Sequence, residues 1–394
     1  MNNTVSVFSQ IIALVSRDEF KMAADELKAE HGAKGFTSWE HFVSMMFCQL
    51  AQAKSLREIS LGLGGCLGKL NHLGMEEPPA KSTLSYANAH RPAELFERVF
   101  SFMLEVCRRS SPGKKAKFRF KNKLFSLDAT TIDLCLSMFP WAKFRQTKGA
   151  VKLHTLLDHD GYLPVFVNVS DGKRHEVKAA WELRLPKGSI VAIDRGYIDY
   201  ELFHKWNDEG VFFVTRMKEN SAFWTIGGSL PVPERSKIVA DQYIVLSGWK
   251  SNRSCPEALR LVTARHEDGT ELRFLTNNFD LSASTIAEIY KDRWEIEIFF
   301  KTIKQNLKVK TFVGTTRNAL LIQIWTALTA ILLLKYLQFK SRLSWAFSNL
   351  VAMLRWNLFN NRDLWAWLNG ELTIQEPPDS GQMYQPLLDS IFTG

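Results

Sequence analysis

The sequence predicts an α/β protein in which a mixed β-sheet flanked by helices follows an all-helical domain and is interrupted by a β-rich subdomain. Three observations lead to this prediction. Apolar residues recur at helical spacing through residues 1–110, short apolar strands alternate with helices in 123–217, and turn-rich strands follow in 218–280. A chain of 394 residues also exceeds a single typical core, so two or three domains are expected.

The charge balance favours a polyanionic partner, because the formal net charge is +9 and the isoelectric point is about 9.2. The five cysteines are far apart and form no C-x-x-C pair, which is typical of a reducing cytoplasm and argues against a zinc cluster. No basic segment followed by an apolar run opens the chain, so no signal peptide is expected. The longest uncharged segment, 318–334, is shorter than the ~20 residues that cross a bilayer, which predicts a buried core helix and no membrane partner.

Residues 1–110 are predicted to form a helical DNA-binding domain. Thr37 and Glu40 form a capping box that begins one helix, and Pro92 opens another. Between them, residues 81–91 are rich in small polar and basic side chains. A short polar helix between two packed ones is typical of a helix-turn-helix reader, although a purely structural helical bundle fits the same pattern.

A basic linker is expected at residues 111–122. The stretch 108–123 around it holds eight basic residues and no acid, with a Pro-Gly pair inside. Such a segment suits a path along DNA phosphates, and a merely solubilising linker explains it equally well.

The first part of a catalytic core, 123–217, is predicted to run as three strands, helix, strand, helix, strand. The first strand, 123–130, has Asp128 as its last inward residue, and the fourth, 189–193, delivers Asp194 at its end. The remaining elements are strands 151–158 and 163–169 joined across an Asp-Gly turn, helices 175–185 and 199–209, and strand 211–215. This order resembles the RNase H-like fold, in which the first and fourth strands are neighbours, so the resemblance implies that Asp128 and Asp194 lie side by side.

An inserted β-rich subdomain is predicted at 218–280, with strands at 242–246, 258–265 and 272–276. The final helices of the core follow at 281–340, and a helical C-terminal region with a polar tail occupies 341–394.

Residues 290–304 are predicted to form one uninterrupted helix. On a helical projection Tyr290, Arg293, Glu297 and Lys304 share a face with Lys301 beside them, next to an apolar stripe. One acid ringed by bases suits a metal-binding carboxylate held against an anionic backbone. An ion pair between Arg293 and Glu297, or between Glu297 and Lys301, on an ordinary surface explains the same residues.

Asp128, Asp194 and Glu297 together indicate a site for hard, oxygen-liganded cations, Mg²⁺ or Mn²⁺, because no cysteine or histidine cluster accompanies them. Two such ions ~3.5–4 Å apart activate a water or a 3′-hydroxyl and stabilise the leaving oxygen of a phosphodiester. Close carboxylates repel one another without the ions.

The spacing Y-x-x-R-x-x-x-E-x-x-x-x-x-x-K of Tyr290, Arg293, Glu297 and Lys304 resembles the signature of DDE transposases of the bacterial "IS-four" family. Asp128 in Leu-Asp-Ala-Thr and Asp194 in Ile-Asp-Arg-Gly-Tyr match the settings of that family's first two acids. The resemblance covers about residues 120–340 and includes the inserted β-rich subdomain.

This resemblance implies cut-and-paste transposition of DNA, with Asp128, Asp194 and Glu297 as catalytic ligands of two metal ions per active site. It implies that the protein binds double-stranded DNA, both terminal inverted repeats and target, as a homodimer in the cytoplasm. Tyr290, Arg293, Lys301 and Lys304 are then expected to contact DNA. Alternatives are an endonuclease without strand transfer and a non-catalytic DNA-binding protein derived from a transposase.

Further DNA contacts are expected from two regions. In the family an aromatic of the inserted subdomain commonly stacks on a flipped base, and Trp249 and Trp224 lie there; packing in the core is the alternative role for either. Lys148 belongs to a basic loop with Lys143, Arg145 and Lys152 that suits backbone contact, and a solvated loop explains it nearly as well. His175 and Glu176 follow a turn that reaches the edge of the site, or begin a helix at the surface.

Overall fold

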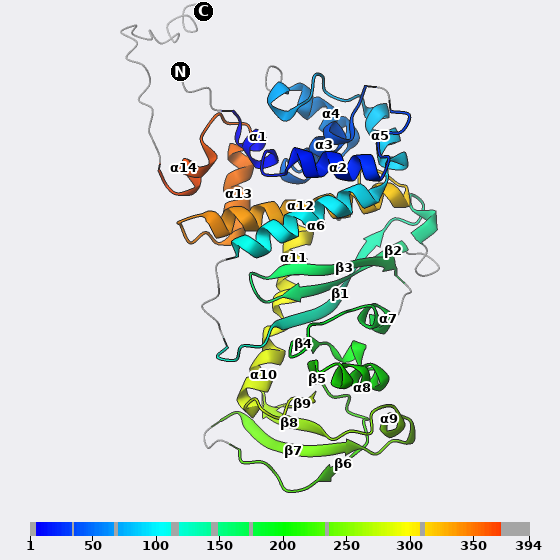
Figure 1. The fold of residues 1–394 in the computed structure, drawn as a ribbon, viewed down its shortest axis with the longest axis vertical. Helices are drawn as coiled ribbons and strands as arrows, with labels where there is room; N and C mark the ends of the chain where they lie inside the picture. The colour runs from blue at the N-terminus through cyan, green and yellow to red at the C-terminus, as the bar shows by residue number, and fades with distance from the viewer. Residues whose placement is uncertain are drawn as a thin grey trace, which may run out of the picture.

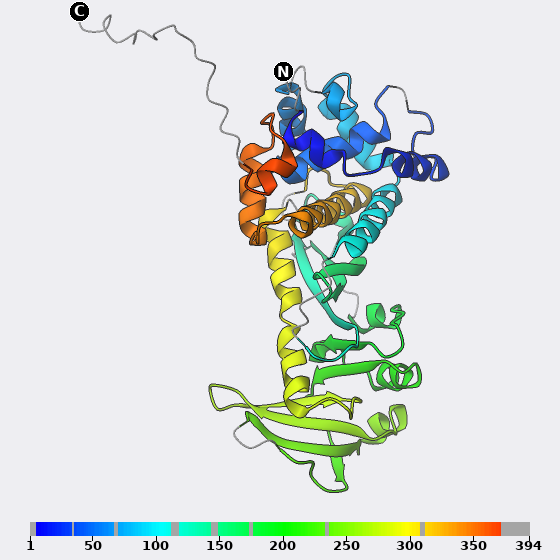
Figure 2. The same ribbon diagram turned by 60° about the vertical axis from the view of Figure 1, so that its left-hand side comes forward.

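The computed structural model describes residues 5–33, 35–66, 70–111, 118–142, 149–172, 176–232, 236–307 and 312–371. It is elongated, with the N-terminal helices at one end and the inserted strands at the other (Figure 1). Two consecutive helices, α10 (Ala283–Asp292) and α11 (Glu295–Asn306), run alongside the sheet between these ends (Figure 2).

The N-terminal helices share one hydrophobic core with a long central helix, α12 (Arg317–Lys340). They are α1 (Val7–Ile12), α2 (Arg17–Glu26), α3 (Ser38–Leu50), α4 (Leu56–Gly64), α5 (Lys81–His90) and α6 (Ala93–Ser110). The capping box of Thr37 and Glu40 begins α3, and Pro92 precedes α6, as expected. The chain beyond α12 forms α13 (Phe347–Asn357) and α14 (Leu364–Leu368).

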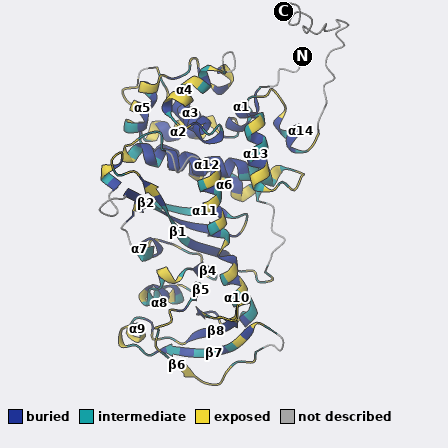
Figure 3. Cartoon of the chain, turned by 180° about the vertical axis from the view of Figure 1, so that it is seen from behind, coloured by how far each residue is buried: buried dark blue, intermediate teal, exposed yellow. Residues whose placement is uncertain are grey.

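The prediction of a buried core helix near residues 318–334 is confirmed by α12. Among the described helices it alone is long and apolar enough to span a membrane, and 83% of its most apolar stretch is buried within the protein (Figure 3). Its neighbours on either side are α3 and α6, which present apolar side chains to it. The all-helical end and the sheet are therefore joined through a common core, with α12 at its centre.

His41 gives this core a pH dependence. Its ring is fully buried in α3, Nε2 lies 2.9 Å from Asn88 Oδ1, and burial, aided by the charge of Arg91, lowers the pKa of His41 to about 3. A histidine that stays neutral when folded but is protonated when unfolded stabilises the protein above its unfolded pKa of 6.5, and this stability is lost as the pH falls toward the folded pKa.

We expect the free energy of unfolding to fall by about 2 kcal/mol between pH 6.5 and pH 5 through this one group. Urea unfolding should show that the free energy of unfolding of the His41→Asn variant depends less on pH than that of the wild type in this interval. This holds whether the variant is more or less stable overall. The same replacement at exposed His90 serves as the control. If the free energies of unfolding of His41→Asn and the wild type fell equally with pH, His41 would not be the source of this pH dependence.

The β-sheet confirms the predicted mixed arrangement. Its order is β3-β2-β1-β4-β5-β9-β8-β7-β6, with β1 antiparallel to β2 and parallel to β4. The strands of the core are β1 (Leu124–Leu134), β2 (Gly149–Asp158), β3 (Leu163–Asp171), β4 (Ile190–Ile193) and β5 (Phe212–Arg216). The first and fourth strands are neighbours, as the RNase H-like resemblance implied, and α7 (Glu176–Trp181) and α8 (Tyr200–Asp208) connect the later strands.

The inserted strands continue this sheet. They are β6 (Phe223–Ile226), β7 (Ile238–Leu246), β8 (Leu259–Arg265) and β9 (Glu271–Thr276), with α9 (Trp249–Ser254) between β7 and β8. Because β9 pairs antiparallel with β5, the nine strands form one continuous sheet. The sequence predicted β7, β8 and β9 but missed β6 and α9, which are short and largely exposed.

Four predicted boundaries differ appreciably from the structure, one of them that of β7, which begins at Ile238 rather than at residue 242. β1 does not end at residue 130 but continues to Leu134, because β2 pairs with it along its whole length. α7 ends at Trp181, short of the predicted residue 185. The helix expected over 290–304 is divided, since Arg293 and Trp294 form a tight turn between α10 and α11 in which Trp294 N–H donates to Lys291 O and Glu297 N–H to Trp294 O.

Candidate active site

Three carboxylates are carried to the site by three different elements. Asp128 lies within β1 and Asp194 directly follows β4. Leu127 pairs with Ile193 across these parallel strands, so the two aspartates occupy the next positions on neighbouring strands. Glu297 lies in the first turn of α11, which packs against β1. Residues far apart in the sequence thus meet at the face of the sheet that α10 and α11 cover.

Arg293 joins two of these acids. Its Nη1 donates to Asp128 Oδ2 at 3.1 Å and its Nη2 donates to Glu297 Oε1 at 3.0 Å, with the side chain only 6% exposed. The expected ion pair between Arg293 and Glu297 therefore exists, but its guanidinium is buried and shared with Asp128, and only Glu297 is partly exposed. The guanidinium also lies 5.5 Å from the centre of the Tyr290 ring.

The carboxylates of Asp128, Asp194 and Glu297 carry more negative charge than the single guanidinium of Arg293 neutralises. Burial, with smaller contributions from the nearby Asp194 and Glu297, raises the pKa of Asp128 to about 6 against the lowering effect of the Ala129 N–H and Arg293. Burial likewise raises the pKa of Tyr197, again with Asp128 and Asp194 contributing. The Tyr197 hydroxyl is buried and has no hydrogen-bond partner among the described residues. The raised pKa of Asp128 and the unpartnered hydroxyl of Tyr197 both indicate that an additional cation would stabilise this site.

A fourth acid, Glu176, lies beside Asp194. A Cβ placed on Gly196 would lie 2.8 Å from Glu176 Oε2 and 3.6 Å from Asp194 Oδ2, so Gly196 is what lets these carboxylates approach. Glu176 Oε1 accepts from Lys152 Nζ at 3.0 Å. The sequence had placed Glu176 at the edge of the site, and Lys152, expected in a basic loop, is instead part of β2; His175 lies outside the described residues.

The remaining residues of the 290–304 face take different positions. Lys304 Nζ donates to Thr131 O on β1 at 2.9 Å, so it ties α11 to the strand that carries Asp128. Lys301 is exposed, and Tyr290 is half-buried with its ring 5.0 Å from that of Phe274. Lys148, like Lys143 and Arg145, lies outside the described residues.

The two tryptophans of the insertion are at the surface. Trp249 at the start of α9 is 75% exposed and Trp224 on β6 is 70% exposed. The alternative that either packs in the core is wrong, because the short elements that carry them leave these faces uncovered. Both rings are available to a ligand.

A groove connects Asp194 to the insertion. It has a volume of about 1170 Å³ and extends from Asp194 along α10 to the turn between β8 and β9. Its basic lining residues are Arg195, Arg216, Lys237, Arg265, His266, Lys291 and Arg293. Acids alternate with them, and Lys237 pairs with Glu267 at 2.9 Å. The groove is long enough for a polymeric ligand that reaches both Asp194 and the inserted strands.

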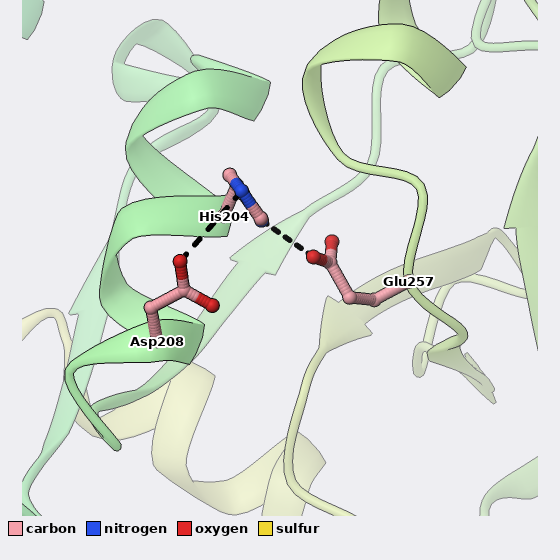
Figure 4. Close-up of side chains that lie close together, drawn as sticks. All are labelled: His204, Asp208 and Glu257. Atoms are coloured by element: carbon pink, nitrogen blue, oxygen red, sulfur yellow. Dashed lines mark hydrogen bonds and ion pairs between the residues drawn. The ribbon is translucent and has the colours of Figure 1, made fainter.

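A second cluster lies away from these acids, where α8 meets the loop before β8 (Figure 4). His204, Asp208 and Glu257 have ligand atoms within 4.8 Å of one another, the one such group among the described residues. However, Nδ1 of His204 donates to Glu257 at 2.5 Å while its Nε2 faces Asp208 at 3.7 Å. Each carboxylate thus faces a different ring nitrogen, which is the geometry of a bridging histidine between two acids rather than of three ligands around one ion.

The chain is similar to known protein families over two regions. A family model described as "Transposase DDE domain" matches residues 119–333, and one described as a domain of unknown function (DUF4372) matches residues 3–76. The chain is 29% identical over 337 residues to a probable transposase for insertion sequence element IS5377 of Geobacillus stearothermophilus, covering 86% of each chain. It is 28% identical to the putative transposase y4zB of Sinorhizobium fredii, covering 76% of this chain and 81% of the relative. Among solved structures, the cryo-EM piggyBac transposase synaptic complex with hairpin DNA aligns at a TM-score of 0.43 and 9% identity, covering 96% of this chain and 85% of that one.

Proposed function

This chain belongs to the transposase DDE domain family and is a DNA transposase, and we propose that Asp128, Asp194 and Glu297 are the ligands of its catalytic metal ions. The observation that supports this most is the meeting of the three acids. Two stand at adjacent positions on parallel strands, and Arg293 draws the third, 169 residues along the chain from Asp128, toward the first.

The donor set fits Mg²⁺ or Mn²⁺, since carboxylate oxygens are the ligands these ions prefer. The raised pKa of Asp128 and the unpartnered Tyr197 hydroxyl are further signs that the site favours a cation. We propose two ions per active site; when bound, they supply Lewis-acid activation of a water or 3′-hydroxyl and stabilise the leaving oxygen.

The basic residues of the 290–304 segment are proposed to bind the DNA backbone. Arg293 holds one oxygen of each carboxylate, and when an ion takes either of these oxygens the guanidinium is freed to pair with a phosphate. Exposed Lys301 is placed to contact the backbone directly, and Lys304 and Tyr290 line the same side of α10 and α11. This is the role that the signature of the "IS-four" family assigns to Tyr290, Arg293 and Lys304, and we propose membership of that family.

The substrate is proposed to be the terminal inverted repeats of an insertion sequence together with target DNA, bound by a homodimer in the cytoplasm. The groove along α10 leads from Asp194 to the turn between β8 and β9, and Trp249 and Trp224 stand exposed elsewhere on the insertion. We propose that one of them stacks on a base flipped near the cleavage site. Lys148 is proposed to add a backbone contact.

Cleavage and joining of DNA test this function. Purified protein incubated with duplexes carrying the element's ends and a supercoiled plasmid is expected to release 3′-hydroxyl ends and form joined products in Mg²⁺ or Mn²⁺, and to form neither in EDTA. Nicking without joined products would instead favour an endonuclease that lacks strand transfer. Binding of the ends without any nicking would favour a non-catalytic DNA-binding protein.

A further inference from the structure

Three buried side chains, those of Ser126, His159 and Asp292, form a hydrogen-bonded chain between β1 and the end of α10. His159 Nδ1 donates to Asp292 Oδ2 at 2.7 Å, and His159 Nε2 lies 2.7 Å from Ser126 Oγ. Their exposed fractions are 0% for Ser126, 2% for His159 and 4% for Asp292. A buried polar chain of this kind is stabilising and directional only when its members are paired, as these are.

This hydrogen-bonded chain joins β1, which carries Asp128, to the end of α10, from which the turn at Arg293 and Trp294 leads to Glu297 on α11. Ser126 precedes Asp128 by two positions on β1, so both side chains leave the same face of the strand. Asp292 ends α10 and is followed at once by Arg293, the residue that holds both acids. His159 stands between them, and its own N–H donates to Leu124 O at 3.0 Å, which fixes its backbone to the start of β1.

Ser126, His159 and Asp292 are the residue types of a hydrolase triad, but they do not form one here. A nucleophilic serine has to meet its substrate, whereas Ser126 is fully buried under α10 and its hydroxyl is engaged by His159. The arrangement is instead suited to holding two elements in one register. Apolar packing of α10 and α11 on the sheet tolerates small slides and rotations, and directional hydrogen bonds at the turn between the helices remove that freedom.

We propose that Ser126, His159 and Asp292 are positioning residues that fix the α10–α11 turn on β1 and thereby set Glu297 against Asp128. This inference rests on the proposed function, because the position of Glu297 matters only if both acids serve one centre. The three residues act through Arg293 and the backbone of β1 and do not touch the substrate.

The test compares His159→Gln with His154→Gln. His154 is also fully buried on β2 and pairs with a serine, with Nε2 2.9 Å from Ser170 Oγ, but it lies opposite Ala129 and so faces the other side of the sheet from Asp128. For each variant we would measure the unfolding midpoint without metal, Mn²⁺ affinity by calorimetry, and kcat and KM for cleavage of an end duplex.

We expect His159→Gln to weaken Mn²⁺ binding and lower kcat by about 10- to 100-fold, the usual effect of losing a partner that orients a metal ligand, with KM unchanged. His154→Gln should lose comparable stability but keep both values. Equal Mn²⁺ affinity and kcat in the two variants would overturn the inference. If His159→Gln fails to fold, Ser126→Ala, which removes a single hydroxyl, is expected to show the same loss of Mn²⁺ affinity to a smaller degree, and no loss would overturn it.

The same calorimetry separates this inference from the proposed function. If Glu297→Gln binds Mn²⁺ as well as the wild type, the proposed metal centre itself is wrong. If Mn²⁺ binding requires Glu297 but not His159, only the positioning role fails.

Discussion

Replacing Glu297 with glutamine is expected to lower metal-dependent strand cleavage by about a thousandfold, which corresponds to about 4 kcal/mol of transition-state stabilisation. The amide keeps the shape of the side chain and its place in the first turn of α11, but it is a far poorer ligand for a hard cation. Single-turnover cleavage of an end duplex in Mg²⁺ gives the rate, and a gel-shift titration in EDTA gives DNA affinity. We expect the affinity to stay within about threefold, or ~0.7 kcal/mol.

Glu295→Gln is the matched control for this variant. It lies in the same helical turn, two residues away and on a different face, so its cleavage rate should remain near that of the wild type. Cleavage by Glu297→Gln at the wild-type rate would remove Glu297 from the site.

Replacing Arg293 with methionine is expected to destabilise the protein by about 2–3 kcal/mol in EDTA. The change leaves Asp128 and Glu297 facing each other without their shared cation, while the partial exposure of Glu297 limits the loss. Because divalent ions neutralise the same carboxylates, Mn²⁺ should restore part of this stability and should stabilise the variant more than the wild type. Urea unfolding in EDTA and in Mn²⁺ measures both effects.

Arg265→Met provides the comparison for Arg293. Arg265 pairs with Glu271 at 3.6 Å on the exposed side of the insertion, so its loss should change the free energy of unfolding by no more than ~0.5 kcal/mol under either condition. An Arg293→Met variant whose destabilisation is identical with and without Mn²⁺ would contradict the placement of Arg293 between two metal ligands.

The positions of Asp128 and Asp194 could be predicted from the sequence because the order of strands and helices resembles the RNase H-like fold, in which the first and fourth strands are neighbours. The resemblance of 290–304 to a family signature then added Glu297, and the comparisons confirm the transposase DDE domain, although not the finer family. The burial of Arg293 could not be predicted, since its second partner, Asp128, lies 165 residues away. Its spacing to Glu297 is shared by any ion pair on a helix surface.

Other features escaped prediction for similar reasons. His159 is a lone histidine after a strand, and nothing local marks it as the partner of both Ser126 and Asp292. The exposure of Trp249 and Trp224 depends on how short β6 and α9 are, whereas hydrophobicity alone favours burial. That the insertion extends the main sheet depends on the pairing of β9 with β5, which strand propensity does not specify.

Asp128, Asp194 and Glu297 are proposed to ligate one metal centre, and anomalous scattering from a crystal grown with Mn²⁺ would locate the ions there. We expect anomalous peaks within coordination distance of carboxylate oxygens of all three residues, with Arg293 turned away from at least one of them. Peaks confined to His204, Asp208 and Glu257, or a site at which Arg293 still bridges Asp128 and Glu297 with no ion between them, would contradict it.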